Sequence, residues 1–549
     1  MGDECGYFAS DHWTERYRDA VERVASGEHM TEAIAESQLP EPPDECGRPA
    51  TADGRCVFHA PPESTEEGDL LAALRRTAER SDDGIRIVGL RAETLEISHE
   101  AFGTERDTPV SLPLATVESF AVSNASFGPA LDLTGSSFGQ LRLDATTFHN
   151  RVTASYVHVA GETDAEDATF TSPLVSIRSH HEGATSFDHA TFERRRNKLT
   201  GATFAGPFSA KHARFEDDLV CSGARFLDEV TFERAVLHRV NALGVTFDDE
   251  AAFRKVRFHG EVVLRDATFE GRPVFHRATF AERVDLDGAT LREGGTFRDA
   301  TFDGELSCRL DGADGVIDFR GAELKGGDLG PVGTVQFDCS GATLGPVTFQ
   351  RADGPSLSTV ALAGTRYDGF DFAPYGSELE PDWRLETESF ADESAPAPWL
   401  TYLRAKNAAD AAGNGVAVAE FFRREMAARR ASYFAQARTG PVRDRLYAAT
   451  KWARSWALNL SCGYGERPGN TVVLSIAIIV VYAAAYLGTI GGSALDNLVF
   501  SIQTFVAFLF GNVPSASGRF VELLTASEAF FGGFTIALFV FALTRSIHR

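Results

Sequence analysis

A short apolar repeat in the middle of the chain restricts the folds that this sequence can adopt. Ala is repeatedly followed two positions later by Phe or Leu. From Phe247 to Phe302 the central apolar residues are spaced alternately six and five residues apart. An α-helix repeats every 3.6 residues and a strand every two, so neither element alone explains this unit. The Ala-x-Phe motif begins at Ala125, Ala168, Ala190, Ala202, Ala213, Ala224, Ala267, Ala278 and Ala300, and Leu replaces Phe after Ala289, Ala322 and Ala342.

Short extended segments, each followed by a corner, do fit a unit of five to six residues. Residues two apart on an extended segment point the same way, so the Ala and the Phe of each unit both face inward. A unit this small buries its apolar face only against its neighbours, which is the property of a solenoid. The repeat therefore predicts a β-helix with a filled interior.

Over residues 120–375 the sequence resembles the pentapeptide-repeat family, whose consensus is a small residue, a polar residue and a central Leu or Phe. The resemblance implies a right-handed, roughly four-sided β-helix with about four units in each coil. The frequent sixth residue departs from a strict five, and we expect bulges at the corners. Some acidic members of the family are similar in outline to a DNA duplex and inhibit topoisomerases, so a DNA-mimic-like interaction module is an alternative role.

Composition limits the environment and the partners of the chain. The net charge is −25, and Lys supplies only six of the 53 basic residues. This balance is typical of halophilic proteins, although an ordinary acidic surface would also explain it. An acidic chain is not expected to bind nucleic acid, whose phosphates select for Lys and Arg. We find no nucleophile with a base at catalytic spacing and do not expect an enzyme.

Two Cys and one His near the N-terminus have the spacing of metal ligands. Cys46, Cys56 and His59 form a C-x9-C-x2-H arrangement, and Cys5 or His12 could supply a fourth ligand. The string resembles half of a small treble-clef-like zinc knuckle. It predicts a structural zinc ion in residues 1–65, with unligated, reduced cysteines as the alternative. Seven scattered Cys do not indicate a disulfide framework, and residues 1–23 contain no secretory signal.

The remaining segments are assigned by composition. We expect a lead-in and cap of the β-helix over residues 66–119, and an acidic, Pro-containing linker over 376–398. A helical connector follows over 399–465, with helices at 399–411 and 416–437. Its last part, 443–460, is a basic amphipathic helix with Trp, which suits a membrane interface and the position of the slide helix of inward-rectifier-like channels. A soluble amphipathic helix is the alternative.

The C-terminal residues 466–549 carry the membrane signal. Residues 471–487 and 523–544 are long and apolar enough to span a bilayer twice. The apolar segment 498–513 between them is too short to cross, and a helix that enters and returns is tolerated only when it packs inside protein. Basic residues flank the same side of both spans, so we expect a cell-membrane protein with both termini in the cytoplasm. These residues are Arg454, Arg467, Arg545 and Arg549.

This order of span, re-entrant helix, loop and span resembles the pore module of two-transmembrane potassium channels. The resemblance implies a homotetramer in lipid that conducts a monovalent cation through a ring of carbonyls. Only the last Gly of the expected Thr-Val-Gly-Tyr-Gly is present, and Leu509 stands where the first Gly should be. The filter candidates are Thr504, Ala507, Phe508, Leu509, Phe510, Gly511 and Asn512, and the inner-helix candidates are Glu528, Gly532 and Gly533.

Two functions remain open at this stage. In the first, the β-helix is a sensor or docking arm for a cytoplasmic protein partner and is coupled to a conducting pore. In the second, the chain is a membrane-tethered scaffold whose pore module does not conduct.

Overall fold

The computed structural model describes most of the chain and divides into two compact units. One unit comprises residues 1–361 and 389–393, and the other comprises 362–388 and 394–549. The described residues are 5–25, 32–41, 43, 45–46, 48–50, 54–80, 84–97, 109–194, 196–390, 396–439, 441–511 and 518–547.

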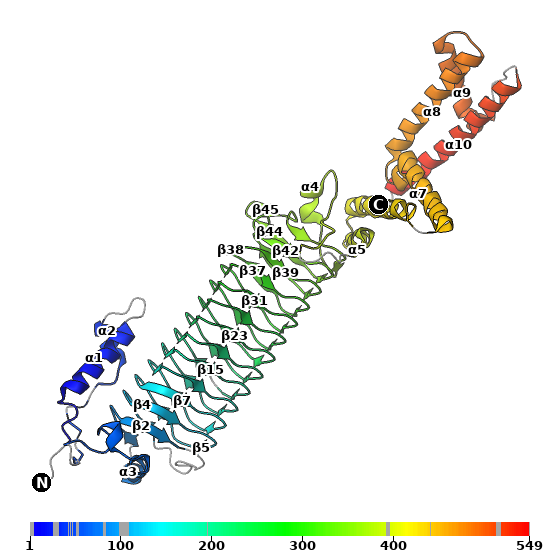
Figure 1. Ribbon diagram of the computed structural model, residues 1–549. Helices are drawn as coiled ribbons and strands as arrows, with labels where there is room; N and C mark the ends of the chain where they lie inside the picture. The colour runs from blue at the N-terminus through cyan, green and yellow to red at the C-terminus, as the bar shows by residue number, and fades with distance from the viewer. Residues whose placement is uncertain are drawn as a thin grey trace. The chain divides into compact units, whose positions relative to one another are not determined.

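The first unit is a β-solenoid of about 12 turns (Figure 1). One of its sheets starts with β1 (Ile85–Arg86) and β3 (Val110–Ser111) and continues to β44 (Val347–Arg351). Apart from the terminal hairpin of β44 and β45 (Gly354–Pro355), the strands of the described coils pair in parallel. The β-helix predicted from the repeat is therefore confirmed.

In the middle of the solenoid, each coil contains four short strands. In one sheet β13 (Leu174–Val175) pairs with β17 (Asn197–Lys198), which pairs in turn with β21 (Leu219–Val220). Paired residues lie 21 to 23 positions apart, as in Leu131↔Val152 and Val175↔Lys198. Four units of five to six residues account for this coil length.

The repeated Phe side chains stack on one another from coil to coil. Phe253, Phe275 and Phe297 form one such ladder, with ring centroids 4.7 and 4.9 Å apart and nearly parallel planes. The Ala of each motif is buried beside the ladder, as Ala278 is. A small side chain is required there because strands of neighbouring coils lie only about 4.8 Å apart.

The corners differ in detail from the expected bulges. The residue before the motif Ala has a left-handed backbone, as at Asp266 (φ 55°), Arg277 (φ 57°) and Asp299 (φ 56°). Gly occupies the same corner at Gly201, Gly223 and Gly244. One left-handed residue turns the chain sharply, and it lies in the five-residue interval of the repeat, as Arg277 does between Phe275 and Phe280.

Parallel pairing begins at β1, before residue 120, the expected start of the β-helix. Ile85 pairs with Val110, and Val110 pairs with Leu131. These first coils bury Ile, Val and Leu without the Ala-x-Phe motif, so the repeat does not reveal them.

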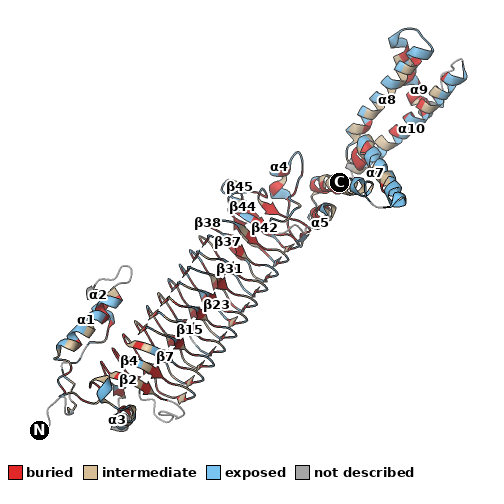
Figure 2. Ribbon diagram, in the orientation of Figure 1, coloured by how far each residue is buried: buried red, intermediate tan, exposed pale blue. Residues whose placement is uncertain are grey.

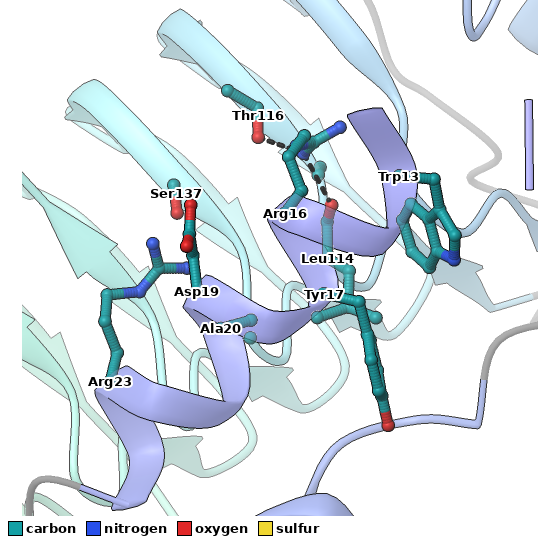
Figure 3. A pocket seen from close by; sticks show the side chains of 11 residues that line it. Trp13, Arg16, Tyr17, Asp19, Ala20, Arg23, Leu114, Thr116 and Ser137 are labelled. Atoms are coloured by element: carbon teal, nitrogen blue, oxygen red, sulfur yellow. Dashed lines mark hydrogen bonds between the residues drawn. The ribbon is translucent and has the colours of Figure 1, made fainter. Parts of the chain in front are cut away.

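Helices cover the N-terminal coils. Helix α3 (Glu67–Arg80) packs on β2 (Arg91–Glu96), and α1 (Asp11–Ala25) lies along the side of the coils near α2 (Glu32–Gln38). A short helix η1 (Pro62–Ser64) precedes α3. Figure 3 shows Arg16 of α1 donating to the carbonyl of Leu114, 3.1 Å away. The pocket beside Arg16 holds only about 50 Å³, which is too small for an organic ligand.

The second unit is helical. It begins with β47 (Arg366–Tyr367) and η2 (Ala373–Tyr375), and α4 (Gly376–Leu379) follows at the start of the expected acidic linker. Helices are present where the sequence predicted them in residues 399–465, as α5 (Pro398–Ala411), α6 (Gly415–Gln436) and α7 (Val442–Cys462). The predicted spans and the short helix between them are α8 (Pro468–Thr489), α9 (Ala494–Phe510) and α10 (Arg519–Ile547), and η3 (Gly463–Gly465) links α7 to α8.

Candidate functional sites: a membrane module and a Cys and His cluster

Helices α8 and α10 are long and apolar enough to cross a membrane. Their most apolar windows have a mean hydropathy of 2.3 and 1.8, and only 17% and 28% of these windows are buried. Large parts of both helices are exposed (Figure 2), and many of their exposed residues are apolar. They include Val473, Ile476, Val480 and Val481 on α8, and Phe530, Phe534, Val540 and Phe541 on α10. Helices of a soluble core would bury these side chains, so both helices are candidate membrane spans.

The short helix α9 is held between the two spans by one carboxylate. Glu528 of α10 is fully buried. It accepts a hydrogen bond of 2.7 Å from the Tyr486 hydroxyl of α8 and a second one from the Ser501 hydroxyl of α9. A buried charge or carboxyl group needs such partners, because a bilayer offers no water to replace them. Glu528 therefore joins all three helices of the module.

Two glycines of α10 allow α9 to approach closely. A Cβ atom on Gly532 would lie 2.1 Å from the backbone oxygen of Phe505, and one on Gly533 would lie 2.7 Å from the ring of Phe508. Small residues at such crossings let helix backbones touch in a membrane. The predicted inner-helix residues Gly532 and Gly533 thus lie against α9.

The predicted filter segment does not have an extended backbone, and this corrects the sequence interpretation. Thr504 is buried within α9, and the helix continues through Ala507 and Phe508 to Phe510. The amide of Gly511, with φ 66°, donates to the Ala507 carbonyl over 2.9 Å and ends the helix. Leu509 and Phe510 have helical backbones, and Asn512 lies outside the described residues.

The local sequence explains this difference. A carbonyl ring needs left-handed backbone, which Gly adopts readily and Leu does not. Ala, Phe and Leu let the helix continue until Gly511, the first residue that can take a positive φ without strain. The Ala507 carbonyl, which accepts from the Gly511 amide, cannot at the same time coordinate an ion in a ring.

The connector helices contact the ends of the spans. Arg545, in the last turn of α10, forms a 2.9 Å salt bridge with Glu466, and its guanidinium lies 5.0 Å above the ring of Phe422 in α6. Arg430 of α6 donates to the Tyr464 hydroxyl over 3.0 Å. Glu466 is buried, which strengthens its pairing with Arg545. A displacement of α6 would therefore reach the end of α10 directly.

The same helix also holds the segment that follows the β-helix. The ring of Phe421 in α6 packs edge-on against Phe372 at 4.8 Å and against Trp383 at 5.3 Å. Phe421, Phe372 and Trp383 are all buried. Helix α6 thus contacts residues 372–383 on one side and the membrane helices on the other, within one compact unit.

The structure brings together the four N-terminal residues selected as zinc ligands. The donor atoms of Cys5, Cys46, Cys56 and His59 all lie within 4.8 Å of one another. His59 Nδ1 lies 3.4 Å from the Cys5 and from the Cys56 sulfur, and the sulfurs of Cys46 and Cys56 are 3.6 Å apart. Cys5 is the fourth member, whereas His12 does not belong to the cluster.

Two thiols this close affect each other's ionisation. A hydrogen bond from Cys56 lowers the pKa of Cys46 to about 3, and His59 and Arg48 act in the same direction. The hydrogen bond to Cys46, together with burial, raises the pKa of the Cys56 thiol. Of these two thiols, Cys46 is the one that ionises more readily, and thiolate is the form that binds metals.

A second cluster was missed from the sequence. His158 and His180 are paired residues of neighbouring coils, their rings stack 5.6 Å apart, and both lie beside Glu182. Glu182 is 3.0 Å from His158 and half exposed. The 22-residue separation of the two His residues equals one coil, which is the signal that could have revealed this cluster.

Comparison with known proteins supports the repeat assignment. Residues 264–310 match the family model described as pentapeptide repeats (9 copies). No curated protein and no solved structure matches the chain. The chain thus contains pentapeptide repeats within a β-solenoid, followed by a helical region with two candidate membrane spans.

Proposed function

We propose that this is a channel-like membrane protein in which four copies assemble around α9 and α10 and conduct a monovalent cation. The observation that supports this most strongly is the position of α9. A short apolar helix is held between two spans by Glu528 and lies on α10 at Gly532. A single membrane anchor would not need such a helix.

In this proposal the β-helix is a cytoplasmic sensor or docking arm for a protein partner. The contacts of α6 with Phe372 and Trp383, and with Arg545 through Phe422, provide the coupling to α10. Both termini are cytoplasmic because Arg454, Arg467 and Arg545 flank one side of the spans. The acidic, Lys-poor composition suits a halophilic cell, where salt screens the charge.

The helical backbone of residues 507–510 favours a second candidate, a membrane-tethered scaffold that does not conduct. Here the module would be a tetrameric or monomeric anchor, and the β-helix would carry the function by binding a protein.

The two candidates are separated by the conductance of the purified full-length protein in planar bilayers with concentrated KCl and a series of substituted ions. A channel gives discrete unitary currents that disappear when residues 509–511 are deleted. The control is a variant with one Gly inserted beside Gly491, a position where a side chain would meet nothing within 4 Å. The currents of this variant should persist. A protein that crosslinks as a tetramer and remains silent at every voltage is a scaffold.

A further inference from the structure

The Cys and His cluster lies where a metal ion would fasten the N-terminal segment to the β-helix. Cys5 belongs to the segment that leads into α1, whereas Cys46, Cys56 and His59 belong to the segment before α3. The amide of Cys5 donates to the carbonyl of Arg48 over 3.0 Å, so the two segments are already in contact at the cluster.

The spacing of the donor atoms fits tetrahedral zinc. Ligands placed about 2.0–2.3 Å from a zinc ion at tetrahedral angles lie roughly 3.5–3.8 Å from one another. Two sulfur–nitrogen separations in the cluster are 3.4 Å, the Cys46–Cys56 sulfur separation is 3.6 Å, and all of the donor separations lie within 4.8 Å. Three thiolates and one imidazole form a closed ligand set that leaves no position for a substrate, which is typical of structural zinc.

The surroundings of His59 select the nitrogen that would bind the metal. Its Nε2 lies 2.9 Å from the carbonyl oxygen of Val88, and a carbonyl can only accept, so Nε2 carries the proton. Nδ1 then presents its lone pair to the sulfurs of Cys5 and Cys56. Ligating His residues are commonly oriented by such a partner. The Tyr7 ring stacks on His59 at 4.3 Å and excludes water from the buried side of the cluster.

The cluster is also attached to the first coil of the solenoid. Val88 follows the last residue of β1 by two positions, and the Arg91 amide of β2 donates to the Phe58 carbonyl over 2.9 Å. On the other side, Trp13 of α1 lies so close to Gly89 that a Cβ there would be 2.6 Å from its ring. Residues 5–13 thus cover the first coil, and the cluster holds their beginning.

We propose that Cys5, Cys46, Cys56 and His59 bind one structural zinc ion that clasps residues 5–13 and α1 onto the N-terminal coil of the β-helix. The zinc clasp, as we call these four residues with their ion, caps an end that would otherwise expose unpaired strand edges and apolar coil interior. This role is independent of whether the membrane module conducts.

Metal analysis of the full-length protein, purified in detergent from cells grown with zinc, tests the site. We expect about one zinc per chain. Cys46 is the most exposed of the four ligands, so its substitution disturbs packing least. Cys46→Ser should lower the zinc content roughly tenfold or more, whereas Cys46→His replaces one ligand by another and should retain it.

Two control variants test whether the zinc belongs to this cluster. Cys221→Ser removes a buried thiol in the solenoid far along the chain from the cluster and should keep the zinc. The double variant His158→Ala with His180→Ala removes the second cluster and should also keep it. A wild-type protein without zinc that takes up none, or a Cys46→Ser protein with its full zinc content, would overturn the site. A disulfide between Cys46 and Cys56, found by thiol titration, would also overturn it.

Hydrogen exchange tests the clasp itself. Removing zinc with a chelator should lower the amide protection of residues 5–25 while the central coils keep theirs. Unchanged protection of this segment after complete removal of the ion would overturn the clasp.

Discussion

In the β-helix each coil is the template for the next, whereas in the membrane module each helix contact is made once. The ladder through Phe253, Phe275 and Phe297 is one of several, and a ring in its middle has an equivalent neighbour above and below. The module instead depends on Glu528 and Gly532, whose contacts with α9 are not repeated elsewhere in the described helices. A repeated core distributes its stabilisation along the coils, while a single contact concentrates specificity in a few atoms.

This difference separates stability from function in the molecule. A residue repeated in every coil is selected for stacking, so the Phe ladders say little about a ligand. A buried carboxylate in an apolar helix is costly and needs a particular partner, so Glu528 points to the architecture that the module must keep.

The largest expected effect comes from breaking a ladder in its middle. Phe275→Ala removes a ring that is 1% exposed and stacks on both sides, and we expect a loss of about 3–5 kcal/mol in the unfolding free energy of the β-helix. Phe127→Ala, in β5 (Ser126–Phe127) at the end of its sheet, should lose less because the Phe127 ring packs on Phe148 at a tilt, with centroids 5.8 Å apart, and does not stack on it. Guanidinium unfolding of the full-length protein in detergent, followed by far-UV circular dichroism, measures both.

The surface control for this experiment is Arg272→Ala, in the same coil as Phe275 and exposed. It should change the free energy of unfolding by no more than about 0.5 kcal/mol. Equal losses for Phe275→Ala and Phe127→Ala would mean that stacking on both neighbouring coils adds nothing to the contribution of a ring.

The next effect tests the close crossing in the membrane module. Gly532→Ala places a Cβ 2.1 Å from the Phe505 oxygen, so α9 must move away, and we expect the module to lose about 1–3 kcal/mol. Gly488→Ala in α8 meets nothing within 4 Å and should be neutral or slightly stabilising, since Ala is the better helix former. The maleimide reactivity of Cys462, a buried thiol of the same unit, reports opening of the helices.

Glu528 allows a finer test of the same module. Glu528→Leu leaves the Tyr486 hydroxyl without its carboxylate acceptor, while the Ser501 hydroxyl can still donate to the Ile479 carbonyl, 2.9 Å away. The substitution should cost about 1–2 kcal/mol. Glu528→Gln keeps an acceptor oxygen and the shape of the side chain. Its loss of stability should be less than half that of Glu528→Leu. If the Glu528→Leu protein proved as stable as the wild type, the carboxylate would not be what holds α9.

The features that could be predicted from the sequence were those set by short-range pattern. The Ala-x-Phe period depends only on local alternation and stacking, so it located the coils from Ala125 onward. The helices of the second unit were placed by apolar length and by breakers such as Asn414, whose side chain accepts from the Ala417 amide over 3.1 Å and caps α6. The first coils escaped because Ile85 and Val110 fill the interior without the motif.

The candidate sites were harder to predict, because they depend on contacts that spacing does not determine. Cys46, Cys56 and His59 are near one another in the chain, but only the fold shows that Cys5 lies beside them. The filter candidates were chosen by alignment with a family, which assumes that family's backbone, whereas Leu509 continues the helix that precedes it.

The smallest expected effect tests a polar exception within the β-helix. His181 takes the place of a Phe in the ladder that contains Phe204, and its ring stacks on Phe204 at 5.0 Å. The Nδ1 atom of His181 lies 2.8 Å from the Thr163 hydroxyl, and its Nε2 atom lies 3.1 Å from the Ser179 hydroxyl. Burial lowers its pKa to about 3, so the folded protein keeps it neutral. An unfolded chain binds the proton below its ordinary pKa of about 6.5. The folded state therefore loses stability as the pH falls below about 6.5, by about 1 kcal/mol at pH 6.

His181→Phe completes the ladder and removes the imidazole that takes up a proton on unfolding. The difference in unfolding free energy between this variant and the wild type should therefore shrink with rising pH and become constant above about pH 7.5. His259→Ala changes an exposed His and should leave the pH dependence as it is. Unfolding free energies measured from about pH 5 to 8 decide the matter: parallel curves for wild type and His181→Phe would mean that His181 takes up its proton without unfolding. In that case a single coil would tolerate a buried charge, and the stacking neighbours of a repeated core would be more adaptable than the single contacts of the membrane module.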